Sequence, residues 1–507
     1  MKFSGQTRFL LALASGLTLA LAFPNYNLPL LAWISVGLLV LASYRARLRV
    51  APLFGFLYAL VFYPVCLPWI DVVVQQYGGV PPLTAAGLVV LIALAAGVFW
   101  AIFTWGIAFA SRKGPLWTCV LAPCLWVTME FTISRLPIIG FPWNLVGYAA
   151  SRSLALLQLT AITGIYGLSF VVAGFGALIA HAVLVGTQRA WQTVIAGASV
   201  LIVIGWGASY FVPQPDRARF VAHLVQTNFP QSYTYPPNWM ETHAGDLQEL
   251  SQISVDAAKR LPGIIVWPET PAPFSLQDDT FAADAKKIAE DSGQDFVVGV
   301  EDWKMNVPHP YATNSAVLLG PNGQRLFTYD KIHLVPFGEY VPLRKWLTFA
   351  GKLTADIGDF APGRRYGVGD LPSGKFGAFI CYEATFPNLV RHFSRNGAEL
   401  LINMSNDGWF GRSAAPAQHL MMARVRAVEN RRWLLRDTNN GFTADVDPYG
   451  RIVVALATDI RGELDAPYDL RSDITPYVRF GDWFAWLCVF ASIAMLIGAG
   501  IARPKTA

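Results

Sequence analysis

The chain has 507 residues, of which 54% are hydrophobic and 14% are charged, and its mean hydropathy is +0.39. The formal net charge of +5 is explained by short basic loops between apolar segments. A nucleic-acid partner is therefore not expected, because no basic face is needed to account for the charge.

Eight apolar segments are near the length that crosses the hydrocarbon core of a bilayer, although the first two are short, and we predict eight transmembrane helices. Seven precede the polar region and one follows it: 9–23, 28–43, 52–70, 83–110, 116–134, 163–186, 191–211 and 483–501. We expect a membrane domain of seven helices at 1–212, a soluble domain at 213–482, and a final helix with a cytoplasmic tail at 483–507.

Basic residues indicate how these helices are oriented. They fall in alternate loops and at both chain ends: Lys2, Arg8, Arg45, Arg47, Arg49, Arg112, Lys113, Arg189, Arg503 and Lys505. The intervening short segments carry Arg135 and Arg152. The positive-inside rule therefore places both termini in the cytoplasm and residues 214–479 on the opposite face. If the first segment is instead a cleavable signal peptide, one helix is lost and the others keep their orientation.

The soluble region alternates strand-like and helix-like patterns. Predicted strands lie at 220–225, 263–267, 295–300, 377–381 and 399–403, predicted helices at 239–261, 281–292, 386–396 and 418–431, and turn signals for hairpins at 321–323 and 447–450. This alternation predicts a mixed sheet with helices on its outer face.

Cys381 is the only cysteine in the soluble region, since the other four lie in or beside predicted spans. It has no disulfide partner there, so it is either a small buried hydrophobic residue or a reactive thiol. Glu269 and Lys331 favour the second interpretation. A thiol with an ordinary pKa of about 8.5 needs a carboxylate to take its proton and a cation to stabilise charge. We expect Glu269 to take the proton, and Lys331 to hold the thiolate and then the oxyanion, together with the N–H of Tyr382.

Four sequence blocks occur in a specific order. They are Trp-Pro-Glu at 267–269, the run Asp-Lys-Ile-His-Leu-Val-Pro-Phe-Gly-Glu-Tyr at 330–340, Ile-Cys-Tyr-Glu at 380–383 and Asn-Asp-Gly-Trp-Phe-Gly at 406–411. Together they resemble the nitrilase (carbon-nitrogen hydrolase) superfamily. With the predicted spans and Gly-Phe-Pro-Trp at 140–143, nearly the whole chain resembles the bacterial apolipoprotein N-acyltransferases, which are membrane-embedded members of that superfamily.

The resemblance implies an αββα sandwich in the catalytic domain. It also implies that Glu269 is the general base, Lys331 the electrophilic stabiliser and Cys381 the nucleophile, with Glu339, Tyr382 and Glu383 in supporting roles. Soluble amidases of the superfamily commonly carry Cys-Tyr-Asp-x-Arg-Phe-Pro, whereas this chain reads Cys-Tyr-Glu-Ala-Thr-Phe-Pro at 381–387. The missing arginine argues against a small carboxylated amide as substrate.

The reaction implied by the resemblance moves a fatty acyl chain from a phospholipid, through a thioester on Cys381, to the α-amine of the S-diacylglyceryl-cysteine that begins an apolipoprotein. This reaction is the last step of bacterial lipoprotein maturation, takes place at the inner membrane with the catalytic domain in the periplasm, and predicts ping-pong kinetics. No cofactor is expected. No metal is expected either, because His309, His333 and His419 lack metal-ligand spacing.

The sequence allows two interpretations of the role of several residues. Residues 229–240, with Trp239, and 341–352, with Trp346, are either lids at a membrane-facing entrance or ordinary surface loops. Glu130, inside a predicted span, has either a structural partner or a catalytic role. Four arginines form either a solvated or ion-paired face or a binding site for lipid phosphates: Arg424, Arg426, Arg431 and Arg432.

Two other functions compete with acyl transfer. A membrane-tethered amidase of the nitrilase type would use the same three side chains to hydrolyse a small C–N substrate. A permease with a sensor domain would use the spans for transport, although the spans contain few paired charges and no evident inverted repeat.

Overall fold

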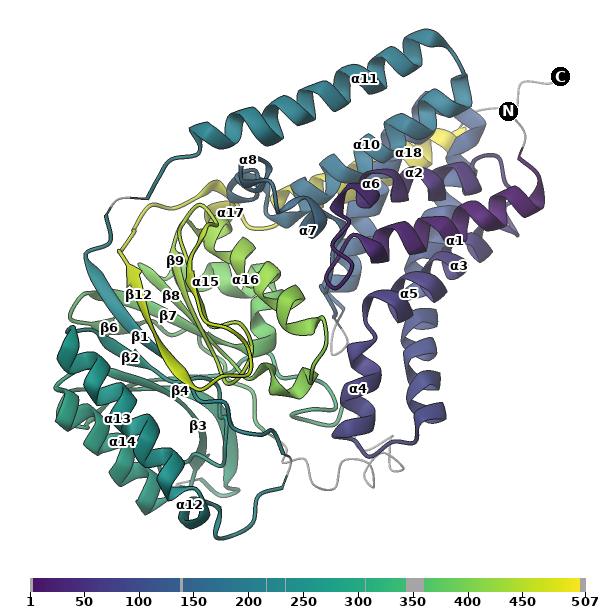
Figure 1. Cartoon of the computed structure of the whole chain (residues 1–507). Coiled ribbons are helices and arrows are strands. Elements are labelled where there is room, and N and C mark those ends of the chain that lie inside the picture. The colour runs from purple at the N-terminus through teal and green to yellow at the C-terminus, as the bar shows by residue number, and fades with distance from the viewer. Residues whose placement is uncertain are drawn as a thin grey trace.

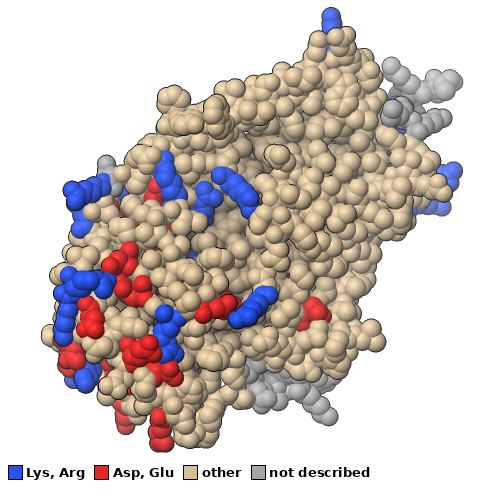
Figure 2. Space-filling model, viewed as in Figure 1, with Lys and Arg blue, Asp and Glu red and all other residues tan. Residues whose placement is uncertain are grey.

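The computed structural model describes residues 3–136, 140–215, 217–232, 234–305, 307–342 and 360–501. A group of apolar helices lies on one side of the molecule and an α/β domain on the other (Figure 1). On the face drawn in Figure 2, acidic and basic side chains gather over the α/β domain, whereas the helical part is nearly free of charge except at its tips. This division of charge is typical of a protein whose helices contact hydrocarbon.

The helical part is built mainly from the first two fifths of the chain. Its elements are α1 (Gly5–Leu21), α2 (Ala32–Ser43), α3 (Ala51–Cys66), α4 (Trp69–Gln76), α5 (Pro82–Ala110), α6 (Pro115–Ser134), α7 (Val146–Ala150), α8 (Leu154–Leu157), α9 (Thr160–Thr163), α10 (Ile165–Val185), α11 (Gln188–Ile202) and, from the other end of the chain, α18 (Trp483–Ile501). The three short helices α7, α8 and α9 were not predicted.

In the part of the chain that the structure describes, fewer than eight helices have the length and apolar composition of a membrane span. Within the described residues, five are long and apolar enough: Pro82–Lys113, Pro115–Ser134, Ile165–Val185, Gln188–Phe211 and Trp483–Ile501. A sixth span results if α3 and α4, which are bent by 62° relative to each other, count as one. The count of eight is therefore not confirmed, although the helical character of the predicted segments is.

Proline explains the bend between α3 and α4. Pro64 lies inside α3 and Pro68 directly precedes α4, and proline both removes a backbone donor and clashes with the preceding turn. After the bend, the chain runs toward the α/β domain, where the hydroxyl of Tyr77 donates to the carbonyl of Gly408 at 2.7 Å. The broken helix thus makes a contact between the two parts of the protein.

The described residues of the α/β domain form two six-stranded sheets, not the one sheet expected from the strand pattern. The first has the order β12 (Gly462–Tyr468), β1 (Phe220–Gln226), β2 (Ile264–Val266), β3 (Phe296–Lys304), β4 (Tyr311–Leu319) and β5 (Arg325–Asp330). The second has the order β11 (Ile452–Ala455), β10 (Ala444–Val446), β9 (Trp433–Thr438), β8 (Leu400–Ser405), β7 (Gly374–Ile380) and β6 (Gly369–Leu371). The central strands β1, β2 and β3, and likewise β7, β8 and β9, are parallel.

Each sheet is covered by helices on its outer face (Figure 1). The first carries α13 (Ala244–Arg260) and α14 (Asp279–Ser292), and the second carries α15 (Pro387–Arg395) and α16 (Ala415–Asn430). Side chains alternate between the two faces of β3, so both faces of the first sheet are buried. Val298 packs with the core under α13 and α14, whereas Val297 packs into the core on the other face. The nitrilase-like α/β domain implied by the resemblance is confirmed. The predicted helix 239–261 is divided into α12 (Trp239–Thr242) and α13.

Candidate active site

Glu269 lies just beyond β2, on a turn that the buried indole of Trp267 anchors. The indole N–H donates to Ser254 at 2.9 Å. Glu269 is 5% exposed, and its Oε1 accepts hydrogen bonds from Asn314 Nδ2 at 2.8 Å and from Lys331 Nζ at 2.9 Å. Its Oε2 accepts the backbone N–H of Asn406 at 2.9 Å. The carboxylate is thus fixed by three donors.

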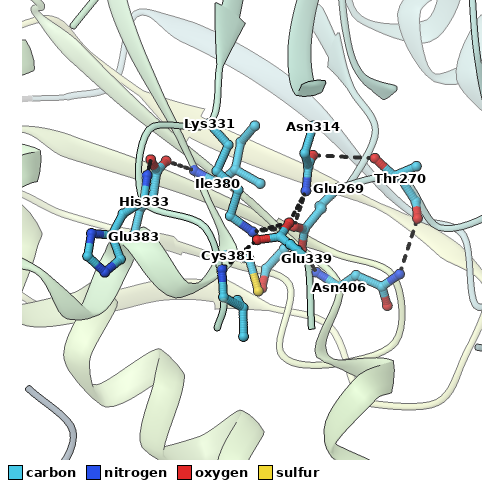
Figure 3. Close-up of polar contacts among 12 residues, drawn as sticks. Glu269, Thr270, Asn314, Lys331, His333, Glu339, Ile380, Cys381, Glu383 and Asn406 are labelled. Atoms are coloured by element: carbon cyan, nitrogen blue, oxygen red, sulfur yellow. Dashed lines mark hydrogen bonds and ion pairs between the residues drawn. The ribbon is translucent and has the colours of Figure 1, made fainter. Parts of the chain in front are cut away.

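Lys331 directly follows β5 and is buried between two carboxylates (Figure 3). Its Nζ donates to Oε1 of Glu269 and to Oε1 of Glu339, each at 2.9 Å. Burial works against the charged amine, but the two carboxylates raise the pKa of Lys331 well above its usual value. The site therefore contains a permanent cation.

Cys381 begins the short 3₁₀ helix Cys381–Thr385 that follows β7. Its φ of 49° lies in the left-handed region, which costs an L residue about 1–2 kcal/mol. The thiol points toward the group formed by Glu269, Lys331 and Glu339 (Figure 3). This sharp turn lies at the end of the strand that we predicted at 377–381.

The surroundings of Cys381 act against the thiolate that we expected. Burial, followed by the charge of Glu269, raises the pKa of this thiol far above its usual value, although Lys331 opposes the shift. We expected Lys331 to hold a thiolate, whereas burial and the charge of Glu269 favour the neutral thiol. Glu269 is the carboxylate whose charge acts on this thiol.

Glu339 and Glu383 occupy different surroundings. Oε2 of Glu339 accepts the N–H of Val335 at 2.8 Å, so Glu339 orients Lys331 from within its own loop. Glu383 is fully buried, and it accepts hydrogen bonds from Tyr329 Oη and from three backbone N–H groups, those of Ile332, His333 and Ile380, at 2.7–3.0 Å. Burial raises the pKa of Glu383 to about 7 despite these donors. Glu383 thus ties the segment after Lys331 to the strand that carries Cys381.

Tyr382 connects the turn at Cys381 to the helical part of the protein. Its hydroxyl donates to the carbonyl of Gly140 at 3.1 Å, and its ring lies 6.4 Å from that of Trp143, with 22° between the planes. The indole N–H of Trp143 in turn donates to Gln418 on α16 at 2.7 Å. The Gly-Phe-Pro-Trp segment at 140–143 therefore packs directly beside the site.

Of the two residues that we assigned to possible lids, the structure describes Trp239 but not Trp346. Trp239 is 5% exposed and packs against Phe229, His243 and Phe274, with ring centroids 4.2–6.0 Å away. It is a core side chain in this state, so a lid role for it stays a prediction. Trp346 lies outside the described residues, as does most of the predicted segment 341–352.

The four arginines do not form a solvated face. Arg426 and Arg432 are buried, and Arg426 is paired with Glu429 at 2.9 Å. Arg424 donates to the carbonyl of Ser151 at 3.1 Å, and Arg431 to that of Pro448 at 3.2 Å. These guanidinium groups are used in contacts within the protein, including contacts between its two parts.

Glu130 on α6 has structural partners, as one of our two interpretations held. Its Oε1 accepts hydrogen bonds from the indole of Trp126 at 2.9 Å and from the N–H of Val146 at 2.7 Å. Elsewhere in the described part of the chain, His223, Glu463 and Asp465 are close enough to hold one metal ion. Arg260 already bonds both of these carboxylates, at 3.1 and 2.8 Å, and supplies positive charge there.

Sequence reasoning missed Asn314, which donates to Glu269 at 2.8 Å and to Glu339 at 2.7 Å. One signal was available, because Thr-Asn-Ser at 313–315 interrupts the apolar strand β4 with buried polar residues. A buried amide needs partners. Asn314 holds the two carboxylates at a fixed separation around Lys331.

Comparison with known proteins places this arrangement in a family. Residues 225–472 match the carbon-nitrogen hydrolase family, and residues 15–178 match the apolipoprotein N-acyltransferase N-terminal domain. An apolipoprotein N-acyltransferase from Geobacter metallireducens is 36% identical over 95% of this chain and 93% of its own length. The chain belongs to the apolipoprotein N-acyltransferase family. A second family member, from Methylococcus capsulatus, is 32% identical over 98% of this chain and 96% of its own length.

Membership of the apolipoprotein N-acyltransferase family makes this chain an acyltransferase. The competing amidase interpretation has little support. A solved amidase from Nesterenkonia sp. is 20% identical and covers 50% of this chain and 93% of its own, with a TM-score of 0.37. A similarity at that level carries no argument about activity.

Proposed function

We propose that the protein transfers a fatty acyl chain from a phospholipid to the α-amine of the N-terminal S-diacylglyceryl-cysteine of apolipoproteins, through a thioester on Cys381. The observation that supports this most strongly is the burial of Lys331 between Glu269 and Glu339, beside the thiol, in a chain of this family. Glu269 acts as general base, Lys331 as stabiliser of negative charge and Cys381 as nucleophile.

In the first half-reaction, Cys381 Sγ attacks the carbonyl carbon of the sn-1 ester. Glu269 takes the thiol proton as the S–C bond forms, because the raised pKa of Cys381 makes a free thiolate costly. The oxyanion is stabilised by Lys331 and by the N–H of Tyr382. When the C–O bond breaks, the leaving alkoxide takes the proton from Glu269 and departs as lysophospholipid.

In the second half-reaction, the lipoprotein amine attacks the thioester carbonyl carbon. Glu269, again unprotonated, accepts a proton from the amine, and the second oxyanion is stabilised by the same two donors. The C–S bond then breaks, the sulfur regains a proton from Glu269, and the amide product leaves. Because the first product leaves before the second substrate reacts, the kinetics are ping-pong.

The supporting residues act through these three. Glu339 holds the Lys331 amine in place, Glu383 fixes the strand end before Cys381, and Tyr382 supplies an oxyanion donor. Entrance of lipid chains past Trp239 and Trp346 remains part of this proposal. No cofactor and no metal take part.

We propose that residues 1–212 form the membrane domain, 213–482 the catalytic domain and 483–507 the final helix and tail. The enzyme lies in the bacterial inner membrane, with both termini cytoplasmic and the catalytic domain periplasmic, as the distribution of basic loops favours. Both substrates are then anchored in the same membrane as the enzyme. The acyl donor and the acceptor amine reach Cys381 from the bilayer surface.

Steady-state kinetics of the purified enzyme test this function. Phospholipid and a diacylated lipopeptide are varied together, and mass spectrometry follows the acylated amine. Parallel double-reciprocal lines and an N-acylated product support the proposal. Release of ammonia from small amides without acyl transfer would support the amidase instead, and unchanged activity in a Cys381→Ser variant that inserts normally would rule out this nucleophile.

A further inference from the structure

His419 lies behind the nucleophile and takes no part in the steps described above. It is on α16 and is fully buried. Its Nε2 lies 3.0 Å from the carbonyl oxygen of Cys381, and its Nδ1 lies 3.0 Å from Oδ1 of Asp407. The imidazole therefore lies between the backbone of Cys381 and a buried carboxylate.

The direction of the bond to Cys381 follows from its chemistry. A carbonyl oxygen only accepts hydrogen bonds, so Nε2 of His419 must carry the hydrogen. Nε2 carries a hydrogen both in the neutral ring that this requires and in the imidazolium. In the neutral ring, Nδ1 accepts a hydrogen bond from Arg436 Nη2 at 3.2 Å, whereas in the imidazolium it donates to Asp407. His419 thus donates to the Cys381 carbonyl.

The backbone at Cys381 needs such support. Its φ of 49° is unfavourable for an L residue and persists only where neighbouring groups hold it. On the N-terminal side, Oε2 of Glu383 accepts the N–H of Ile380 at 2.7 Å. On the C-terminal side, His419 holds the carbonyl of Cys381. The bend is therefore fixed at both ends by buried side chains.

The carbonyl of Cys381 and the N–H of Tyr382 belong to one planar peptide unit, and in a trans unit they point in opposite directions. The group that orients the carbonyl consequently orients the N–H. We propose that His419 is a positioning residue that aims the Tyr382 N–H at the developing oxyanion. This inference rests on the function proposed above and adds a residue to its oxyanion site.

His419 is itself held firmly. Oδ2 of Asp407 accepts a hydrogen bond from Arg436 at 2.8 Å, and Oδ1 accepts one from Ser405 at 2.9 Å. Arg436 is also buried, and the ring of Trp143 lies 5.6 Å from that of His419. A ring packed and bonded in this way has one orientation, which a positioning role requires.

Two reactions of the same thiol test the proposal. Acylation of Cys381 by phospholipid, followed in a single turnover by intact mass, develops an oxyanion. Alkylation of Cys381 by iodoacetamide displaces iodide and develops none. Both rates, with the KM for phospholipid, are measured for wild type, His419→Leu, His419→Gln and the control His309→Leu, which alters an exposed histidine.

We expect His419→Leu to slow acylation about 100-fold, as loss of an aligned oxyanion donor does, with alkylation and KM within about threefold of wild type. His419→Gln keeps an N–H donor, so it should acylate at least about tenfold faster than His419→Leu. His309→Leu should match wild type.

Three results would overturn the inference: unchanged acylation in His419→Leu, equal slowing of acylation and alkylation, or His419→Gln no faster than His419→Leu. Failure of the proposed function would look different. In that case, wild-type enzyme would form no acyl adduct while its Cys381 still reacted with iodoacetamide.

Discussion

Lys331 Nζ lies 2.9 Å from Oε1 of Glu339, and that same oxygen accepts a hydrogen bond from Asn314 at 2.7 Å. Glu339 is thus placed to hold the amine without being the base. We predict that Glu339→Gln, which keeps an oxygen acceptor but removes a charge, lowers kcat about 10- to 100-fold and leaves the KM for phospholipid within about threefold. Single-turnover acylation measures the effect.

The matched control for this variant is Glu290→Gln, on the exposed side of α14. It should behave as wild type. If Glu339→Gln acylates at the wild-type rate, Glu339 does not position the amine.

The raised pKa of Cys381 predicts how its reactivity depends on pH. A neutral thiol at rest should alkylate slowly at pH 7, and its rate should keep rising through pH 9 without a plateau. Digestion and mass spectrometry separate Cys381 from the four other free cysteines of the described chain. A plateau below pH 7 would show a preformed thiolate and contradict the account.

The ion pair of Arg426 and Glu429 connects the two parts of the protein. Besides pairing with Arg426 at 2.9 Å, Glu429 accepts the first N–H of α10, that of Ile165, at 2.9 Å. We predict that Glu429→Leu destabilises the protein by about 3–5 kcal/mol, because it leaves a buried cation unpaired, and that adding Arg426→Leu restores part of the loss.

Thermal unfolding in detergent measures these variants. Lys286 and Glu290, an exposed pair 3.5 Å apart, provide the control, and Glu290→Leu should change stability by less than about 0.5 kcal/mol. Equal losses of thermal stability in Glu429→Leu and Glu290→Leu would show that the buried ion pair stabilises the protein no more than the exposed pair does.

His333 predicts a pH dependence of stability. Burial, followed by the charge of Lys331, lowers the pKa of His333 to about 4, from an ordinary value of 6.5. The pKa of His333 is lower in the folded state than in the unfolded state. Its contribution to the free energy of unfolding is therefore fully present above about pH 6.5 and is lost as pH falls toward 4. For a partly exposed ring we expect about 1–3 kcal/mol.

The test compares the apparent Tm of wild type and His333→Gln between pH 7.5 and 4.5. Wild type should lose more stability over this range than the variant, which cannot take up the proton. Parallel curves would exclude His333 as the group responsible.

The sequence predicts the parts of the fold that depend on local pattern. β2 and β7 are short apolar runs that end shortly before Glu269 and Cys381, so their positions could be predicted from the sequence. β9 could not, because Arg436 and Asp437 interrupt its apolar run. Arg436 is buried there only because Asp407, from a distant segment, lies 2.8 Å away. Such pairing is invisible until the sheets form.

The site, too, has residues that the sequence blocks identify and residues that depend on contacts with distant segments. The resemblance named Glu269, Lys331 and Cys381 from their blocks, and the structure brings them together. Asn314 and His419 act through contacts 45 and 38 positions away along the chain, and no local pattern encodes such contacts. The raised pKa of Cys381 likewise depends on burial in the assembled domain. The catalytic roles themselves remain predictions for the experiments above.

The thioester on Cys381 is tested most directly by intact-mass analysis of the purified enzyme after brief exposure to phospholipid without an acceptor. The account predicts a mass increase of one fatty acyl chain, located on Cys381 by digestion, removed by adding a lipopeptide amine, and absent in Cys381→Ser but present in Cys124→Ser. No adduct on the wild-type enzyme, or an adduct on another residue, would contradict it.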